Sequence, residues 1–434
     1  MVMTRSYPDR LAMRPVERPV DADVQLPGSK SLTNRALVLA ALATGTSVLE
    51  GALVSEDSLV MVDSLCRLGI PVELDETTAR IVVQGQGGRI PVDRAELFVG
   101  NSGTTARFLT AMVALGHGEY VIDGVPRMRE RPIQPLLDAL GQLGVDAISL
   151  AGTGCPPVRV RGHGLGGGTV RLRGDVSSQY LSALLMVGPC TRDGLVLELE
   201  GDLVSVPYVE MTLATMADFG ARSWREGERR FVVPGNQGYR ARPYPIEPDA
   251  SGASYFFALA AATGGRVRVL RLSAQSRQGD VHFVNLLERM GCRVIREPDA
   301  ITVIGRRPLR GIEADMNAIS DTVPTLAALA PLAEGPVTIR NVQHIRYKET
   351  DRIAAVATEL RRLGQQVEEY PDGLTITPRP VQPAVIRTYQ DHRIAMSFAI
   401  LGCAVPGIVI DDPGCVAKTF PDFFERLAAA LSRH

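Results

Sequence analysis

The sequence predicts an α/β protein of two similar domains, with helices inside and sheets outside. One mixed α and β unit recurs six times along the 434 residues, and a segment rich in Pro and Gly separates the third copy from the fourth. A chain of this length is too long for one small core, which also favours two domains.

Each copy opens with a small polar cluster, an Ala- and Leu-rich helix and a Gly. The copies start 71 to 74 residues apart, at Gly28, Gly100, Gly174, Pro248, Ile319 and Gln390. This period is longer than the about 20 to 50 residues of solenoid repeats. Because these helices are apolar on most faces, we expect them to be buried.

The second half of each copy adds a short β-branched run, an amphipathic helix ending in Leu-Gly, and two short strands. In the fifth copy these are "VTIRNV", "ATELRRLG" and "QVEEYPDGLTITP", and the central turn of the last predicts a hairpin. A unit of this size buries its helices poorly alone, so three copies are expected to share one core.

The segment "PGNQGYRARPYPIEPD", residues 234–249, is interpreted as a linker. It places copies one to three in a domain of residues 28–247 and copies four to six in residues 248–434. The sixth copy ends without its strand pair. We therefore expect residues 1–27 to donate a strand and to join the second domain, which is then discontinuous, with the active site in the cleft between the domains.

Composition excludes several classes of function. A net charge of −1 argues against a nucleic-acid or anionic-membrane surface. The six cysteines contain no C-x-x-C pair and the six histidines no paired spacing, so neither a disulfide framework nor a metal site is expected. With no apolar run of about 20 residues and no signal peptide, the chain is predicted to be soluble and cytoplasmic.

Polar clusters at helix N-termini attract anions, through free N–H groups and the helix dipole. "GSKSLTNR" brings Lys30, Ser31 and Arg35; it superficially resembles a P-loop but lacks the first Gly of that motif. Alone it fits a Ser-capped helix with two surface cations equally well. "GNSGTTARF" and "DVSSQY", the latter with Ser177, are in isolation more typical of ordinary helix caps.

The loops that precede the second helices concentrate charge. They are "PRMRERP", "IRYKETDR", "DHR" and "CVAKTFPD". Any one of them is typical of a solvated face, but their recurrence at equivalent points of a repeat predicts a site for small, multiply anionic ligands. Among these cations Asp321 and Glu349 are suited to proton transfer, although a helix cap explains Asp321 equally well.

Taken together, eight motifs from Leu26 to Phe423 closely resemble the EPSP synthase (3-phosphoshikimate 1-carboxyvinyltransferase) family. They are "LPGSKSLTNRALVLAALA", "GNSGTTARF", "PRMRERPI", "DVSSQYLSALLM", "DASGASYFFALAA", "KETDR", "DHRIAMS" and "KTFPDF". The resemblance implies two inside-out α/β barrel-like domains, each of three βαβαββ repeats. It also implies a transferase of the shikimate pathway, which leads through chorismate to the aromatic amino acids.

The implied reaction transfers the enolpyruvyl group of phosphoenolpyruvate to the 5-hydroxyl of shikimate 3-phosphate and releases phosphate. No metal or organic cofactor is implied, and we expect a monomer. The residues that match the shikimate 3-phosphate contacts are Lys30, Ser31, Arg35, Ser177, Ser178, Gln179, Ser205, Asp321, His344 and Lys348, with Tyr208 nearby. Those that match the phosphoenolpyruvate contacts are Lys30, Gly103, Arg131, Gln179, Arg352, Arg393 and Lys418. Asp321, Lys348, Glu349 and Lys30 match the catalytic residues, with either Asp321 or Lys348 as the base for the hydroxyl.

Two positions depart from the family pattern. His344 stands where some members carry an Asn that contacts shikimate 3-phosphate. Phe108 stands where many members have Pro, on the helix that positions Gly103. Gly103 itself matches the family and leaves space for the inhibitor glyphosate beside phosphoenolpyruvate.

Two alternatives share the fold. One is UDP-N-acetylglucosamine enolpyruvyltransferase, whose mobile loop usually carries a Cys that "DGVPRMRERPIQP" lacks. The other is a catalytically silent ligand-binding relative, which would have lost acid–base residues that are all present here.

Overall fold

The computed structural model describes residues 7–432, and their contacts divide the chain into two compact units. Unit 1 comprises Met1–Pro27 with Glu247–His434, and unit 2 comprises Gly28–Ile246. The boundary expected at residue 247 lies one residue away from the one observed.

The fifth copy shows the strand order of a complete repeat. Its first strand, β19 (Glu313–Asp315), pairs parallel with β20 (Val337–Arg340), which pairs antiparallel with β22 of a hairpin. That hairpin consists of β21 (Gln366–Tyr370) and β22 (Gly373–Thr377). The helices α9 (Val323–Leu329) and α10 (Arg352–Arg362) follow β19 and β20 in the chain. The repeat is therefore βαβαββ, as predicted.

Copies two and three, in unit 2, have the same strand order. Copy two contains β6 (Arg94–Phe98), α3 (Gly103–Met112), β7 (His117–Asp123), α4 (Gln134–Gln142), β8 (Asp146–Ser149) and β9 (Val158–His163). Copy three contains β10 (Gly168–Arg173), α5 (Ser178–Val187), β11 (Leu195–Glu200), α6 (Val206–Asp218), β12 (Trp224–Glu226) and β13 (Arg230–Val233).

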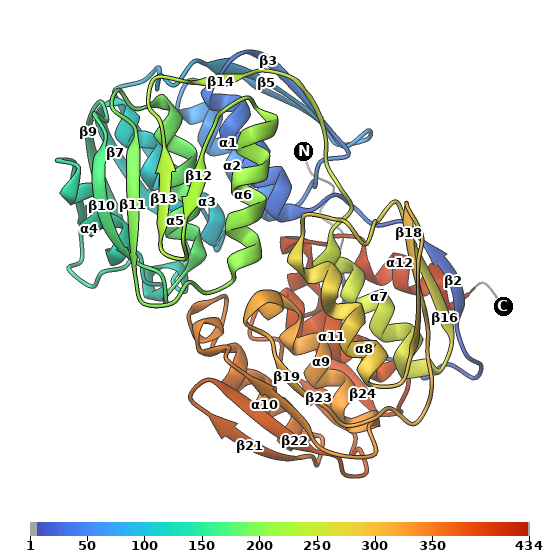
Figure 1. The fold of residues 1–434 in the computed structure, drawn as a ribbon. Coiled ribbons are helices and arrows are strands. Elements are labelled where there is room, and N and C mark those ends of the chain that lie inside the picture. The colour runs from blue at the N-terminus through green and yellow to red at the C-terminus, as the bar shows by residue number, and fades with distance from the viewer. Residues whose placement is uncertain (1–6, 433–434) are drawn as a thin grey trace. The chain divides into compact units, whose positions relative to one another are not determined.

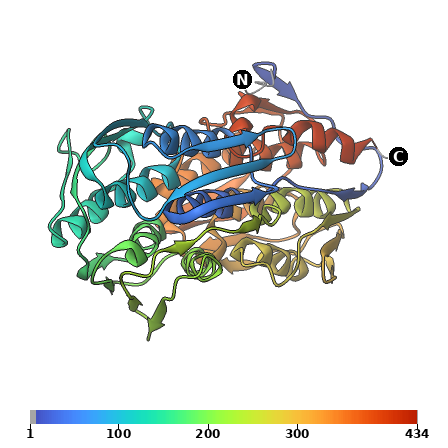
Figure 2. The same ribbon diagram turned by 90° about the horizontal axis from the view of Figure 1, so that it is seen from above.

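Both parts of the N-terminal segment add strands to unit 1. The strand β1 (Arg10–Ala12) pairs antiparallel with β24 (Ile408–Asp411) of copy six, as expected for a donated strand (Figure 2). The strand β2 (Asp21–Val24) pairs parallel with β16 (Arg266–Leu270) and thereby supplies the first strand of copy four. Those copies are completed by α7 (Ala250–Thr263), α8 (Phe283–Arg289), β17 (Arg293–Arg296) and β18 (Ala300–Ile304), and by β23 (Ala384–Ile386), α11 (His392–Gly402) and α12 (Phe423–Leu431).

The interpretation of residues 234–249 as a plain linker was wrong. Within that segment β14 (Tyr239–Arg240) and β15 (Pro243–Pro245) both pair parallel with β3 (Ala43–Glu50). They supply the first strand of copy one, which otherwise contains α1 (Lys30–Leu42), α2 (Glu56–Arg67), β4 (Val72–Asp75) and β5 (Arg80–Gln86). Pro residues are tolerated there because β14 and β15 lie at the edge of the sheet.

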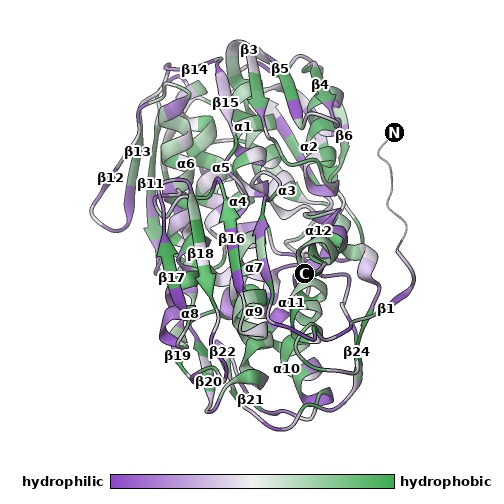
Figure 3. Cartoon of the chain, turned by 90° about the vertical axis from the view of Figure 1, so that its right-hand side faces the viewer, coloured by the Kyte–Doolittle hydropathy of each residue, from purple (hydrophilic) through white to green (hydrophobic). Residues whose placement is uncertain are grey.

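The first helix of each repeat lies in the core of its unit. In unit 2, α1, α3 and α5 are buried almost throughout, and Figure 1 shows β7, β9, β10 and β11 running outside α3 and α5. In unit 1, α7, α9 and α11 pack against one another. Figure 3 shows these helices as largely hydrophobic, whereas the strands alternate. The predicted arrangement of helices inside and sheets outside is thus confirmed.

Candidate active site

Asp321 is the centre of a buried charge cluster in unit 1. It lies in the short helix η5 (Asn317–Thr322). One carboxylate oxygen accepts from Lys348 Nζ at 2.5 Å and from Arg352 Nη1 at 3.1 Å, and the other accepts from Arg393 Nη2 at 2.6 Å. The N-cap of α9 is Thr322. The side chain of Asp321 therefore serves to gather three cations, and the alternative of a simple helix cap is wrong.

Arg352, the first residue of α10, is 1% exposed and bridges the carboxylates of the cluster. It donates to Glu349 at 2.8 Å and, through two nitrogens, to Asp391 at 2.7 and 3.2 Å. Burial alone would lower the pKa of Arg352, but Asp391, Glu349 and Asp321 outweigh it and raise the pKa above its ordinary value. The guanidinium is consequently a permanent charge in a site from which water is largely excluded.

Two further charged residues of "RYKETDR", Arg346 and Asp351, have a structural role. Arg346 pairs with Asp351 at 2.8 Å and with Glu369 at 3.1 Å. Asp351 is also the N-cap of α10, where it accepts from the backbone N–H of Ala354 at 3.0 Å. This pair fixes the start of the helix and so holds Arg352 and Glu349 in place.

Lys348 and His344 are both affected by burial. Burial lowers the pKa of Lys348, and the charge of Asp321 opposes this only in part. An ammonium with a lowered pKa, bonded to a carboxylate, is suited to exchange a proton with a ligand hydroxyl. Burial and the charge of Lys348 lower the pKa of His344 to about 3, so this imidazole is neutral at physiological pH.

Arg393 and Lys418, both buried, complete the cations predicted in unit 1. Arg393 follows His392 at the start of α11 and donates to the Tyr255 hydroxyl at 3.2 Å. Lys418 ends the short helix η8 (Pro413–Lys418). Burial raises the pKa of Tyr255 to about 12 against the opposing charge of Arg393, so the phenol stays neutral.

Sequence reasoning overlooked Asp391 and His392. Asp391 is fully buried, caps α11 by accepting from the N–H of Arg393 at 2.9 Å, and binds Arg352. Its place just before an apolar helix could have indicated the cap, but not the contact with Arg352. His392 is also fully buried, and neither ring nitrogen has a hydrogen-bond partner among residues 7–432.

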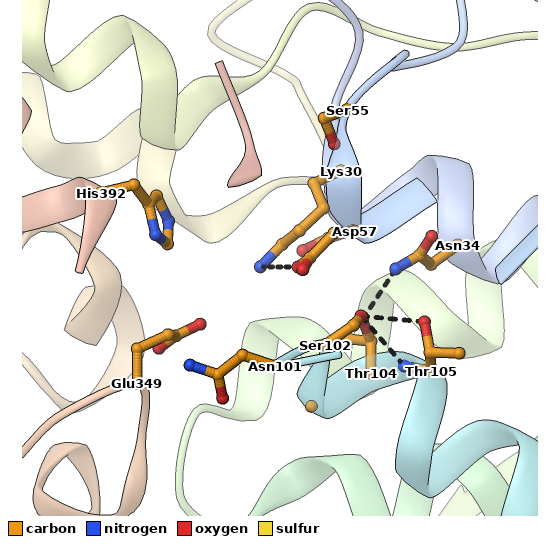
Figure 4. Close-up of polar contacts among 12 residues, drawn as sticks. Lys30, Asn34, Ser55, Asp57, Asn101, Ser102, Thr104, Thr105, Glu349 and His392 are labelled. Atoms are coloured by element: carbon orange, nitrogen blue, oxygen red, sulfur yellow. Dashed lines mark hydrogen bonds and ion pairs between the residues drawn. The ribbon is translucent and has the colours of Figure 1, made fainter. Parts of the chain in front are cut away.

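In unit 2 Lys30 opens α1 behind the N-cap Ser29. Its Nζ lies 3.6 Å from Oδ2 of Asp57, a buried acid that sequence reasoning also overlooked (Figure 4). Asn34, one turn further on, donates to Thr104 Oγ1 at 2.7 Å. This bond joins the N-terminal turns of α1 and α3.

Arg35 is 1% exposed, and protein groups take up several of its donors. It donates to Thr212 Oγ1 at 2.7 Å and, at 3.0 Å each, to the carbonyls of Ser31 and Tyr208. Its guanidinium lies 5.3 Å from the ring centre of Phe108. Burial lowers the pKa of Arg35 to about 10. A guanidinium has five N–H donors, and three of those of Arg35 are therefore used within the protein.

Gly103 and Arg131 lie next to each other in unit 2. Gly103 is the first residue of α3, and a Cβ atom there would lie 3.0 Å from Arg131 Cζ. Arg131 donates to the backbone carbonyl of Asn101 at 2.8 Å and to its side-chain oxygen at 3.1 Å. The missing side chain of Gly103 therefore makes the space in which this guanidinium lies.

The predicted phosphate contacts lie at the starts of α5 and α6. Ser177 is the N-cap of α5 and accepts from the N–H of Gln179 at 3.2 Å, with Ser178 between them. Ser205 precedes α6 in a left-handed conformation, with φ of 54°. The loops that lead to these helices are joined by a bond of 3.2 Å from Val204 N to Gly174 O. This bond holds the loops that precede α5 and α6 next to each other.

The structure therefore gathers the predicted residues into two groups, one in each unit. In unit 1, ion pairs link Asp321 and Glu349 with Lys348, Arg352 and Arg393. In unit 2 most of the predicted residues lie at or near helix N-termini, and Arg131 lies beside one, at Gly103. Within residues 7–432 no group of three or more His, Cys, Asp and Glu side chains is arranged to hold a metal ion, and none of the helices is long and apolar enough to cross a membrane.

Solved structures with this fold include enolpyruvyl transferases. The chain superposes on an EPSP synthase from Acinetobacter baumannii with a TM-score of 0.80 and 25% identity, covering 97% of this chain and 98% of that one. The enolpyruvyl transferase NikO from Streptomyces tendae shares the fold, with a TM-score of 0.76 at 22% identity, over 97% of each chain. The fold and its two groups of buried cations thus define an enolpyruvyl-transferase-like protein.

Comparison with known sequences identifies the family within this class of proteins. The model of the family EPSP synthase (3-phosphoshikimate 1-carboxyvinyltransferase) matches residues 16–427. A 3-phosphoshikimate 1-carboxyvinyltransferase from Nostoc punctiforme is 55% identical over 98% of this chain and 100% of its own length. A chloroplastic one from Arabidopsis thaliana is 47% identical over 98% of this chain and 85% of its own. The chain belongs to the EPSP synthase family.

Proposed function

We propose that the protein transfers the enolpyruvyl group of phosphoenolpyruvate to the 5-hydroxyl of shikimate 3-phosphate, giving 5-enolpyruvylshikimate 3-phosphate and phosphate. The observation that carries this proposal is the cluster in which Asp321 and Glu349 are held among Lys348, Arg352 and Arg393. It offers both proton-transferring groups and fixed positive charge, and membership of the family supports the choice of substrates.

Each of the two steps of the reaction, addition and elimination, needs two proton transfers. In the addition step the 5-hydroxyl oxygen bonds to C2 of phosphoenolpyruvate while its proton passes to the hydrogen-bonded pair of Asp321 and Lys348. Glu349 delivers a proton to C3. In the elimination step C3 returns its proton to Glu349, the double bond between C2 and C3 reforms, and the C2–O bond to phosphate breaks. The departing phosphate takes up the proton held by the pair of Asp321 and Lys348. Asp321 and Lys348 are assigned as a pair because they share one hydrogen bond.

The proposed substrate contacts come from both units. Arg131, Arg352, Arg393, Lys418 and Lys30 hold the carboxylate and phosphate of phosphoenolpyruvate, with Gly103 and Gln179 beside it. Ser177, Ser178 and Ser205 bind the 3-phosphate of the acceptor, and Lys30, Ser31, Arg35, Gln179, Asp321, His344 and Lys348 line the rest of its site. Buried guanidinium groups suit this task, because planar forks bind such oxyanions through two bonds each.

Two narrower points belong to the same proposal. Glyphosate is expected to occupy the phosphoenolpyruvate site, beside Gly103. The protein is expected to act in the cytoplasm, and its six unbridged cysteines suit a reducing compartment.

The test is phosphate release from phosphoenolpyruvate, with shikimate 3-phosphate or UDP-N-acetylglucosamine as the acceptor. We expect release only with shikimate 3-phosphate and its loss in Lys30→Ala. Release only with the nucleotide sugar would overturn the acceptor, and binding without release would indicate a silent relative.

The role of Glu349 is tested separately. Glu349→Gln keeps the shape of the side chain and a hydrogen-bond acceptor for Arg352 but cannot exchange a proton. We expect turnover to fall about 100-fold or more, with binding of shikimate 3-phosphate retained. Near-normal turnover would remove Glu349 from the mechanism.

A further inference from the structure

A further buried carboxyl group, Asp280, lies behind the cluster of unit 1. It belongs to the short helix η4 (Gly279–His282) and is 3% exposed. Its Oδ2 accepts a hydrogen bond from the hydroxyl of Ser251, in the first turn of α7. η4 packs against η5, the helix that carries Asp321. None of the motifs of the sequence analysis includes Asp280, and the proposed reaction does not use it.

The groups that act on Asp280 come from several elements. Asp321 of η5 and Asp249, the N-cap of α7, repel its negative charge, whereas Arg393 of α11 attracts it. α8 contributes buried apolar side chains, and His282 of its own helix is exposed. Burial first, and then the charge of Asp321, raises the pKa of Asp280 to about 6, while the hydrogen bond from Ser251 works in the opposite direction.

Ionisation of Asp280 changes the charge that an anionic ligand meets. Ionisation of Asp280 adds one negative charge beside the carboxylates Asp321, Glu349 and Asp391, which already pair with the cations Lys348, Arg352 and Arg393. The guanidinium of Arg393, which lies 2.6 Å from Asp321, is then attracted by two carboxylates, Asp321 and Asp280. Less of its positive charge is left for a ligand.

We propose that Asp280 is a positioning residue that takes up a proton when phosphoenolpyruvate binds, so that one negative charge fewer opposes the attraction between the ligand and the Arg352–Arg393 pair. The inference rests on the proposed function, which places the anionic ligand at those arginines. A ligand that binds more tightly when Asp280 is protonated must lose affinity as the pH rises and Asp280 of the free protein ionises. Asp280 thus makes the affinity for phosphoenolpyruvate depend on pH without touching the ligand.

The decisive variant is Asp280→Asn, which keeps an oxygen for Ser251 and is permanently neutral. We expect KM for phosphoenolpyruvate at pH 7.5 to be lower than in the wild-type protein by roughly three- to tenfold, the effect of one partly screened charge. The difference should vanish near pH 5.5, where the wild-type carboxyl is protonated. The ratio of the two KM values cancels the titration of the ligand's own phosphate.

A second variant, Ser251→Ala, retains the charge and removes the hydrogen bond that stabilises it. The pH at which KM for phosphoenolpyruvate rises should then move upward relative to wild type, which a merely structural role for Asp280 would not produce. KM for shikimate 3-phosphate is measured in the same assays and should change less than KM for phosphoenolpyruvate in both variants, because the proposed effect acts on Arg393.

Three results would overturn the proposal: a KM ratio that does not vary with pH, a KM raised at every pH in Asp280→Asn, or an unmoved profile in Ser251→Ala. Failure of the proposed function is distinct from these, because the wild-type protein would then show no turnover with shikimate 3-phosphate at any pH.

Discussion

Gly103 shows how one missing side chain controls a binding group. A methyl group at this position would displace the Arg131 guanidinium, which is the flexible end of a side chain. We predict that Gly103→Ala raises KM for phosphoenolpyruvate by about tenfold or more, the cost of one charge-assisted hydrogen bond, with little change in stability. Gly141→Ala, on α4 of the same unit, is the control, since a Cβ there meets nothing within 4 Å. Equal KM values in both variants would contradict the assignment of Arg131.

His344 provides a pH-dependent prediction at the same scale. Its pKa is lowered to about 3 in the folded protein, so the unfolded chain binds a proton more readily below the ordinary value of 6.5. Its contribution to stability is therefore present above pH 6.5 and is lost as the pH falls toward 3. Between pH 7 and 4.5, His344→Asn should lose less unfolding free energy than wild type, by roughly 2 kcal/mol. Denaturant unfolding at both pH values measures this, and a parallel loss would refute it. The exposed His117→Asn is the control.

Some residues of the candidate site could be predicted from the sequence and others could not. Arg352 and Lys348 were predicted because they lie in charged loops at equivalent points of a repeat. Asp57, Asp280 and Asp391 were not predicted, because the role of each carboxylate depends on its contacts with residues of other helices. Asp391 meets Arg352 across 39 positions of the chain. No local pattern encodes such a contact.

At the scale of elements, β2 tests how much a donated strand contributes. Ala22 in β2 is buried against the core of unit 1, whereas Asp23 is partly exposed and pairs with Arg266 and Arg268. Ala22→Asp would bury an unpaired carboxyl group, and we predict a loss of about 3 kcal/mol or more in unfolding free energy. Asp23→Asn should cost under about 1 kcal/mol. Chemical denaturation distinguishes them, and two small losses would mean that β2 is dispensable.

The same strands explain the errors made at this scale. The helices could be predicted because each combines a capping residue, such as Ser29 or Asp249, with a long apolar run. The strands β2, β14 and β15 have two to four residues each, too few for a period to be recognised. Each also pairs with a strand far away in the chain, so β14 and β15 were mistaken for a linker.

For the molecule as a whole, the six-fold repeat predicted both cores, because each inner helix needs the helices of two other copies to bury it. The repeat also predicted that binding groups recur at equivalent helix ends. It did not indicate which acid pairs with which cation, since that depends on side-chain positions within each core.

The division of the proposed site between the two units leads to a prediction about ligand binding. Ser177 and Lys30 of unit 2 and Asp321 and Lys348 of unit 1 are assigned to one acceptor, so binding must bring the units to a common ligand. We predict that shikimate 3-phosphate with inorganic phosphate lowers the radius of gyration, measured by small-angle X-ray scattering, toward the roughly 22 Å of a compact chain of this length. Lys30→Ala should weaken the response by raising the ligand concentration required. An unchanged radius at saturation would mean that ligand binding does not draw the units together, because they are already in place for the ligand or because one unit binds it alone.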